Sequence, residues 1–275
     1  MPLRVVERVG GRTTELLDNF GDFCIFVGHT FAWLLGGLFN VKHWRLLLPQ
    51  FYEVGVRSVP VVGVVGAFIG MVMAVETYAT FAAIGQESRV GSVINVSVVK
   101  QIGPVLAAVM LAGRVGGALA AELGTMRVTE QIDALRVMGS DPIRYLVVPR
   151  FIACVLLTPI LTAYSDVLGI LGGWVIAVFS LHVPNQAYWY YSTHGGVGTW
   201  QIMEGICKAF LFGGAIALIS CYKGFNSGSG ASGVGRACTE GFVASFIAII
   251  ILNFIFAEAS QQMYQAIYGL KSIFG

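Results

Sequence analysis

Three side chains that could do chemistry lie inside consecutive apolar stretches of this sequence, namely Glu76, Lys100 and Gln101. An ionisable group in an apolar helix is costly and normally faces a protein interior or a water-filled cavity. The pattern therefore predicts either a structural ion pair between Glu76 and Lys100 or the polar end of a cavity that binds an amphipathic molecule such as a lipid. Asp166, inside a later apolar run, has no evident partner, and the sequence assigns it no role.

A second group of charged residues lies in the segment Leu111–Arg150. Acidic and basic side chains alternate there with apolar residues such as Leu119, Leu123 and Met126 at helical spacing, which predicts an amphipathic helix over about 118–138. The run Gly139–Pro142 then ends that helix. Such a helix could merely cover the ends of neighbouring helices, or it could be the surface on which a separate cytoplasmic motor pushes.

Motifs for intrinsic catalysis are absent from the sequence. No G-x-x-x-x-G-K-[ST] phosphate-binding loop occurs, and the Gly/Ser-rich stretch Gly224–Gly235 lacks the lysine that such a loop needs. The five cysteines form no C-x-x-C pair, and the four histidines have no carboxylate or cysteine at ligand spacing. We therefore expect no catalytic residues, no metal site and no cofactor, and the protein is not expected to be an enzyme.

Composition places these residues in a membrane. The chain has 275 residues, of which 56% are hydrophobic and 12% charged, whereas a soluble domain carries roughly 25% charged residues. Its mean hydropathy is +0.75. These values exclude an ordinary soluble enzyme and a disordered protein, and a net charge of only +2 gives no field that would attract nucleic acid. An all-α integral membrane protein is predicted.

The elements that must position the charged residues are five apolar runs long enough to cross a bilayer, which needs about 20 residues. They cover about 59–81, 93–111, 145–179, 202–222 and 242–256. We divide the chain into residues 1–57, with amphipathic and membrane-embedded interfacial helices, and residues 58–275, which hold the spans.

Basic residues set the predicted orientation. Arg and Lys both precede and follow the ambiguous apolar stretch Phe23–Phe39. Because cytoplasmic flanks collect these residues, we interpret the stretch as an interfacial or re-entrant helix. Thirteen of the 17 Lys and Arg residues then lie inside, and Arg89, Lys100, Lys208 and Lys271 lie outside or in the outer half. A cytoplasmic N-terminus and an external C-terminus follow.

Glycines recur at G-x-x-x-G spacing within the spans. The pairs are Gly66 with Gly70, Gly113 with Gly117, and Gly169 with Gly173. Small residues at this spacing allow two helices to approach closely in lipid. Packing within one subunit is the simpler interpretation, and dimerisation is the alternative.

Three segments resemble the MlaE/YrbE permeases, the membrane subunits of bacterial ABC systems that move phospholipids together with MCE-domain proteins. They are GAFIGMVMAVETY (Gly66–Tyr78), the block from Lys100 to Arg150, and GGW (Gly172–Trp174). The resemblance covers about Phe51–Phe256. It departs from the family at Lys100-Gln101-Ile102-Gly103-Pro104, where members often read Arg-Glu-Leu-Gly-Pro, and at Glu76, where many carry Gln. One hypothesis is that the cavity carboxylate has moved from the second span to the first.

The resemblance implies a homodimer of five-span subunits in the bacterial inner membrane. Its partners would be a cytoplasmic ATPase that binds the ATP, a periplasmic MCE-domain protein and a small STAS-type accessory subunit. The implied phospholipid cavity comprises Met71, Val72, Val75, Glu76, Tyr78, Lys100, Gln101 and Met110. The implied ATPase-coupling residues are Glu122, Met126, Arg127, Glu130 and Asp133. The competing interpretation is a membrane scaffold or assembly protein without a motor.

Overall fold

The computed structural model describes residues 2–37, 44–194 and 197–268, and within these ranges every regular element is helical. The all-α fold is therefore confirmed. The α-helices are α1 (Pro2–Gly37), α2 (Trp44–Val54), α3 (Val59–Ala82), α4 (Val90–Ser97), α5 (Gly103–Leu111), α6 (Gly117–Val128), α7 (Gln131–Val137), α8 (Val148–Val175), α9 (Asn185–His194), α10 (Thr199–Phe225) and α11 (Gly230–Tyr268).

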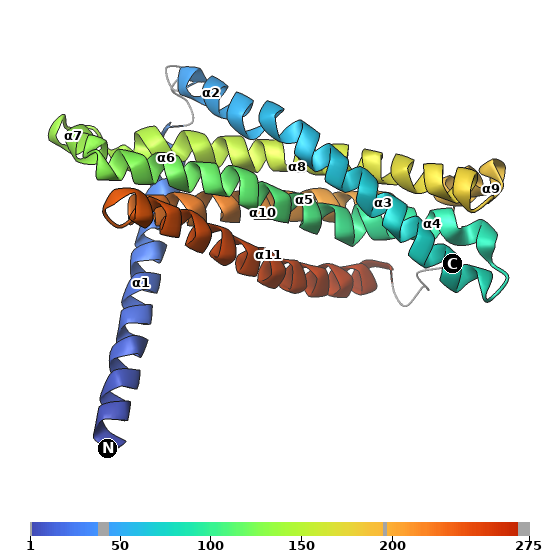
Figure 1. The fold of residues 1–275 in the computed structure, drawn as a ribbon, viewed down its shortest axis with the longest axis horizontal. Coiled ribbons are helices and arrows are strands. Elements are labelled where there is room, and N and C mark those ends of the chain that lie inside the picture. The colour runs from blue at the N-terminus through green and yellow to red at the C-terminus, as the bar shows by residue number, and fades with distance from the viewer. Residues whose placement is uncertain (1, 38–43, 195–196, 269–275) are drawn as a thin grey trace.

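Five helical stretches of the described chain are long and apolar enough to cross a membrane, as predicted. They cover Leu46–Ala82, Glu87–Val128, Ile143–Ser180, Thr199–Phe225 and Gly230–Ile267. All five are longer than the apolar runs read from the sequence, because polar residues extend the helices beyond the apolar core. They lie lengthwise beside one another in the bundle of Figure 1. The second span is built from α4, α5 and α6, joined by π-helical turns at Val98–Ile102 and Ala112–Gly116.

Helix α1 does not join this bundle lengthwise. It leaves the end of the bundle that carries α7 and runs crosswise to the other helices (Figure 1). Its C-terminal part is fixed there: Trp33 Nε1 donates a hydrogen bond of 2.7 Å to Asp141 Oδ2, and the Arg144 guanidinium lies 5.0 Å from the Trp33 ring centroid. The stretch predicted as interfacial or re-entrant belongs to α1 up to Gly37, while Phe39 lies outside the described residues. Its depth in the membrane stays a prediction.

Helices α3 and α8 pack through the predicted glycines. An added Cβ at Gly70 would collide with the Gly169 backbone, one at Gly66 with Ser165, and one at Gly172 with the backbone of Ala67. Two of the three G-x-x-x-G pairs thus bring helices of a single subunit together, which is the simpler of the two interpretations. Gly117 differs, since nothing lies within 4 Å of the position of its missing Cβ.

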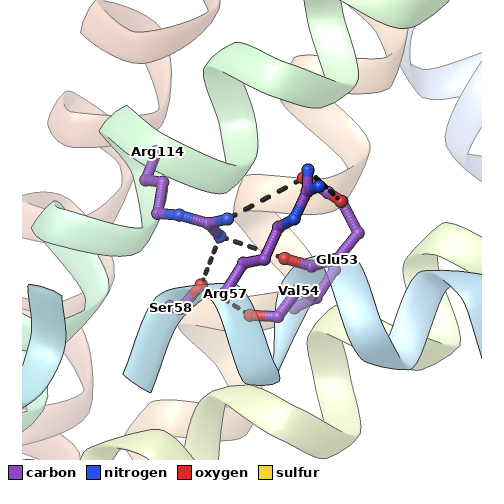
Figure 2. A network of polar contacts seen from close by, with 5 residues as sticks. All are labelled: Glu53, Val54, Arg57, Ser58 and Arg114. Carbon is purple, nitrogen blue, oxygen red and sulfur yellow. Dashed lines mark hydrogen bonds and ion pairs between the residues drawn. The ribbon is translucent and has the colours of Figure 1, made fainter. Parts of the chain in front are cut away.

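A polar network ties the start of the first span to the second span (Figure 2). Arg114 Nη1 donates to the Glu53 carbonyl oxygen at 3.0 Å and to Ser58 Oγ at 2.6 Å, and its Nη2 lies 3.8 Å from Glu53 Oε1. Arg57 forms an ion pair with the same carboxylate at 2.9 Å. Because the helix breaks between Val54 and Val59, Arg114 binds backbone and side-chain groups on both sides of that break.

Candidate functional site

A buried polar cluster joins the second and fourth spans. Lys208 of α10 is fully buried and Glu204, one turn earlier, is 5% exposed. Lys208 Nζ lies 2.9 Å from Glu204 Oε1 and donates a 2.7 Å hydrogen bond to Gln101 Oε1. Lys100 Nζ lies 3.8 Å from the other carboxylate oxygen, Glu204 Oε2. The buried charges are therefore paired, as buried charges must be.

A proline and a π-helical turn in the second span allow this cluster to form. Proline has no N–H, so Pro104 cannot donate the helical hydrogen bond to the carbonyl oxygen of Lys100. Lys208 Nζ instead donates to that oxygen at 3.3 Å. The π-helical turn Val98–Ile102 lies directly before this proline, and such turns are frequent at functional sites. Gly205 allows this close approach of α10, because a Cβ there would lie 2.5 Å from the backbone oxygen of Val99.

The structure brings together only part of the predicted lipid-cavity set. Lys100 and Gln101 join the cluster, while Val72 and Val75 are 58% and 50% exposed on the outer face of α3. Glu76 is also exposed on that helix. The remaining members of the set are half-buried, namely Met71, Tyr78 and Met110. The α3 residues thus form an open face of the single chain.

The predicted ion pair between Glu76 and Lys100 is wrong for this structure. Lys100 pairs with Glu204 of α10, and Glu76 takes part in none of the ion pairs that the described residues form. The physical reason is the packing of α10 against the π-helical turn, which places a buried carboxylate nearer to Lys100 than the exposed face of α3 can.

Glu204 and Lys208 are the functional candidates that the sequence reasoning missed. A signal existed: both are charged, both lie inside the predicted span 202–222, and a Glu four residues before a Lys is a favourable pair on one helix face. Beside them lies an almost entirely apolar cavity of about 460 Å³ between α10 and α11. Its walls include Trp200, Met203 and Phe256.

Asp166 lies on the other side of the second span. It is 9% exposed, and its Oδ1 occupies the place that a Cβ at Gly103 would take. That oxygen has no hydrogen-bond partner among the described residues. Gly103 therefore accommodates the carboxyl group in the π-helical region, although the contact gives Asp166 no chemical role.

The predicted coupling segment forms a helical reversal rather than one helix. Helices α6 and α7 are separated at Thr129 and Glu130, and Glu130 has a left-handed φ of 59°. Arg127 and Asp133 bridge the two helices at 3.1 Å. The chain leaves α7 through Gly139, whose φ is 73°, close to the predicted end of the helix.

The residues predicted to couple to an ATPase divide between an anchor and an exposed edge. Glu122 forms an ion pair of 2.8 Å with Arg150, which is 5% exposed, and this pair fixes α6 to the start of α8. Met126 and Arg127 are half-buried, and Glu130 is exposed. Val137 and Met138 at the end of α7 are 89% and 69% exposed. An apolar tip of this kind, fixed to the bundle by ion pairs, is suited to docking on another protein.

Comparison with known proteins agrees with this arrangement. The family described as Permease MlaE matches residues 47–259. A probable ABC transporter permease protein of Rickettsia felis is 40% identical over 258 residues, which are 94% of this chain and 98% of that protein. A probable ABC transporter permease protein of Synechocystis is 41% identical over 227 residues, covering 82% and 85% of the two chains.

A third relative is named for its substrate. The intermembrane phospholipid transport system permease protein MlaE of Haemophilus influenzae is 32% identical over 238 residues, which are 85% of this chain and 91% of that protein. The five apolar helices and these matches lead to one conclusion. This chain is a multi-pass membrane protein that belongs to the MlaE family of ABC transporter permeases.

Proposed function

We propose that this permease moves phospholipids between the bacterial inner membrane and a periplasmic MCE-domain partner, driven by ATP hydrolysis on a separate cytoplasmic subunit. The name of the Haemophilus relative supports phospholipid as the substrate. The observation that carries the proposal is the buried cluster of Lys100, Gln101, Glu204 and Lys208, because ionisable groups inside a membrane bundle are costly and commonly mark a substrate pathway.

Charge balance in the cluster suggests how a headgroup is held. Two lysines share one carboxylate, Glu204, so one positive charge is left over within the cluster. Lys208 is fully buried, whereas the Lys100 side chain is 32% exposed and pairs at the longer distance. Lys100 is thus the cation that is free to exchange Glu204 for the phosphodiester of a lipid. Glu204, rather than Glu76, supplies the carboxylate that balances the cluster.

The acyl chains would lie against the open face of α3. Val72 and Val75 are exposed there, and apolar side chains of this kind accept lipid chains. We propose that a second copy of the chain covers the rest of this face, which makes the protein a homodimer with the lipid cavity at its interface. Met71, Tyr78 and Met110 are half-buried, and we propose that they line the cavity as well.

The reversal formed by α6 and α7 would carry the motor's movement. Its exposed tip would dock on the cytoplasmic ATPase, and the ion pair of Glu122 with Arg150 would pass the displacement to α8. The proposal includes an N-terminus in the cytoplasm and a C-terminus in the periplasm, and a small STAS-type accessory subunit as a further partner. ATP binding would shift the equilibrium between two conformations of the dimer, and the lipid would have a different affinity for each.

Purification of the tagged chain at native expression in a mild detergent, with co-purifying proteins identified by mass spectrometry, tests the assembly. An ATPase with Walker motifs and an MCE-domain protein are expected in the eluate. Their reproducible absence from folded, intact protein would contradict the transporter proposal and favour the motor-free scaffold.

Headgroup binding has its own test. Lys100→Met should reduce the amount of co-purified phospholipid, since the surplus positive charge is removed, whereas Arg89→Met, a loss of the same charge outside the cluster, should not. Unchanged phospholipid in Lys100→Met would remove Lys100 from the headgroup site.

A further inference from the structure

A second lipid-sized space lies between α1 and the bundle. It is an apolar cavity of about 640 Å³, within the size range of small-molecule sites. Four helices supply its walls: Phe23, Val27 and Phe31 come from α1, Phe151 and Val155 from α8, Leu211, Gly214, Ala215 and Ile219 from α10, and Ala248, Ile251 and Leu252 from α11. None of these residues belongs to the cluster around Lys208.

A polar cavity of about 720 Å³ is lined by other residues of three of these helices, α1, α10 and α11. The charged side chains that line it are two cations, Lys223 and Arg236, and two carboxylates, Asp22 and Glu240. Lys223 and Glu240 form an ion pair of 2.9 Å, in which both side chains are partly exposed. Polar groups of both signs therefore face this space.

The residues that line the two cavities follow one another along α1 and along α10. Along α1, Asp22 lines the polar cavity and the next residue, Phe23, lines the apolar one. Along α10, Ile219 lines the apolar cavity and Tyr222 the polar one. Tyr222 marks the boundary: its ring lies 5.3 Å from that of Phe23. A ligand that fills both spaces must have a polar head and an apolar tail.

We propose that this composite groove binds one zwitterionic phospholipid of the leaflet that surrounds α1, with its acyl chain beside Phe23 and Gly214 and its headgroup between Arg236 and Asp22. The charges argue for a zwitterion, because two cations and two carboxylates sum to zero. Arg236 faces the phosphate, and Asp22 faces the ammonium group. An anionic lipid would leave a carboxylate opposed to its own negative charge.

This site is independent of the proposed transport cavity. Its polar part is lined by the C-terminal end of α10, at Tyr222 and Lys223, whereas the Lys100 cluster contacts Glu204 and Lys208 nearer the beginning of that helix. The two sites share no lining residue. Figure 1 shows where α1 meets the bundle. The lipid would fill the space under α1 and so hold that helix against the bundle. The inference stands whether or not the permease carries phospholipid.

Photocrosslinking locates the lipid. The full-length protein is placed in nanodiscs of equal parts phosphatidylethanolamine and phosphatidylglycerol, with a trace of phosphatidylethanolamine that carries a diazirine on its acyl chain. After irradiation, crosslinks are expected in the peptides that contain Phe23–Phe31 and Leu211–Ile219. Ala215→Phe and Ala248→Phe, which add bulk to the groove from α10 and from α11, should remove these crosslinks. Ala79→Phe, at an exposed position of α3 outside both cavities, should retain them.

The result that would overturn the site is equally specific. Crosslinks to these peptides that persist in both groove-filling variants, or that are missing in the unaltered protein while lipid crosslinks elsewhere are present, would show that no lipid occupies the groove. A protein–protein crosslink at the same peptides would identify a second copy or another partner as the occupant and would also overturn the proposal. Loss of crosslinks around Lys100 would bear on the transport cavity alone.

The charge argument is tested by headgroup selection. Phosphatidylethanolamine should exceed phosphatidylglycerol among lipids retained in native mass spectrometry. Asp22→Asn leaves a net positive groove and should shift retention toward phosphatidylglycerol, whereas Arg236→Gln should lose retained phosphatidylethanolamine. Arg89→Gln, at the other end of the bundle, should change neither. A ratio of the two lipids that is the same in all four proteins would contradict a zwitterion-selective site.

Discussion

At the scale of single residues, Lys208 is the least exposed charged side chain among the described residues. Its ammonium group is fully buried and is balanced by one carboxylate, one amide oxygen and one backbone oxygen. Removing one partner of a buried pair leaves the other charge uncompensated, which costs more than the pair contributes. The stability of the cluster therefore depends on Glu204 and Lys208 as a unit.

Lys208→Met should lower the free energy of unfolding by about 3–5 kcal/mol, because the buried Glu204 then keeps only the longer contact of 3.8 Å with the partly exposed Lys100. Thermal unfolding of the detergent-solubilised protein measures the loss. The double variant Glu204→Gln/Lys208→Met should recover part of it, since the residual charge is removed as well. Two independent, additive losses would show that the residues do not act together.

The sequence identified half of this cluster. Lys100 and Gln101 were recognisable because charge and polarity inside an apolar run are expensive. Their partner was not, since the choice between Glu76 and Glu204 depends on which helix packs against the π-helical turn. Spacing along one helix gives no information about contacts between the second and fourth spans, so the ion pair of Glu76 with Lys100, one of the two alternatives, named the wrong carboxylate.

At the scale of helices, close packing of α3 on α8 depends on glycines whose Cβ positions are occupied by the neighbouring backbone. Gly70→Ala should destabilise the protein, because the new methyl group meets the backbone of Gly169 and must push the helices apart. Gly117→Ala is the matched control: its Cβ meets nothing within 4 Å, and alanine favours a helix by about 1 kcal/mol. Melting temperatures of the two variants should move in opposite directions. A lower melting temperature for Gly117→Ala than for Gly70→Ala would refute this packing.

The Arg114 network makes a second prediction about helices. Arg114→Gln should cost about 1.5–3 kcal/mol, the range for hydrogen bonds to charged groups, because it releases Glu53 and Ser58 at the break between α2 and α3. Arg57→Gln keeps those contacts and serves as the control for lost charge. Limited proteolysis near residues 54–59 should accelerate only in Arg114→Gln. Equally faster proteolysis in both variants would mean that the lost positive charge, and not the hydrogen bonds of Arg114, accounts for the stability of this segment.

Helices were predictable where composition alone determines their extent, and less predictable where contacts with other helices determine it. Apolar length was enough for the five spans. The break at Glu130 and the π-helical turns were not predictable, because both depend on tertiary contacts: the pair of Arg127 with Asp133 bridges the reversal, and Lys208 binds the oxygen that Pro104 leaves without its helical donor. Periodicity showed the amphipathic character of 118–138 and missed its division into two helices.

At the scale of the whole molecule, large apolar faces remain open. In the most apolar stretch of α11, 11% of the residues are buried, whereas 56% are buried in that of the third span. Val72, Val75 and Phe254 are among the exposed side chains. Acyl chains and a second copy of the chain would cover these faces. The assembly proposed above therefore completes surfaces that a single subunit leaves uncovered.

Motor coupling is expected to pass through the reversal at α6 and α7. In the complete transporter, Glu130→Lys should uncouple ATP hydrolysis from lipid transfer while lipid binding stays intact, because a reversed charge at the exposed turn disturbs docking and not the distant cluster. Glu87→Lys makes the same charge change outside the reversal and should have no such effect. Normal coupling in Glu130→Lys would exclude Glu130 from the contact with the ATPase.

Transport itself provides the most direct measurement. The complex that co-purifies with this chain is reconstituted in proteoliposomes with fluorescent phosphatidylethanolamine, and the movement of that lipid between the liposomes and the MCE-domain partner is followed after ATP is added. ATP-dependent transfer is predicted, and Lys100→Met should lose it while a Walker-motif variant of the ATPase abolishes it. Transfer at the same rate without ATP, or with Lys100→Met and the unaltered chain indistinguishable, would contradict an ATP-driven phospholipid permease built around the Lys100 cluster.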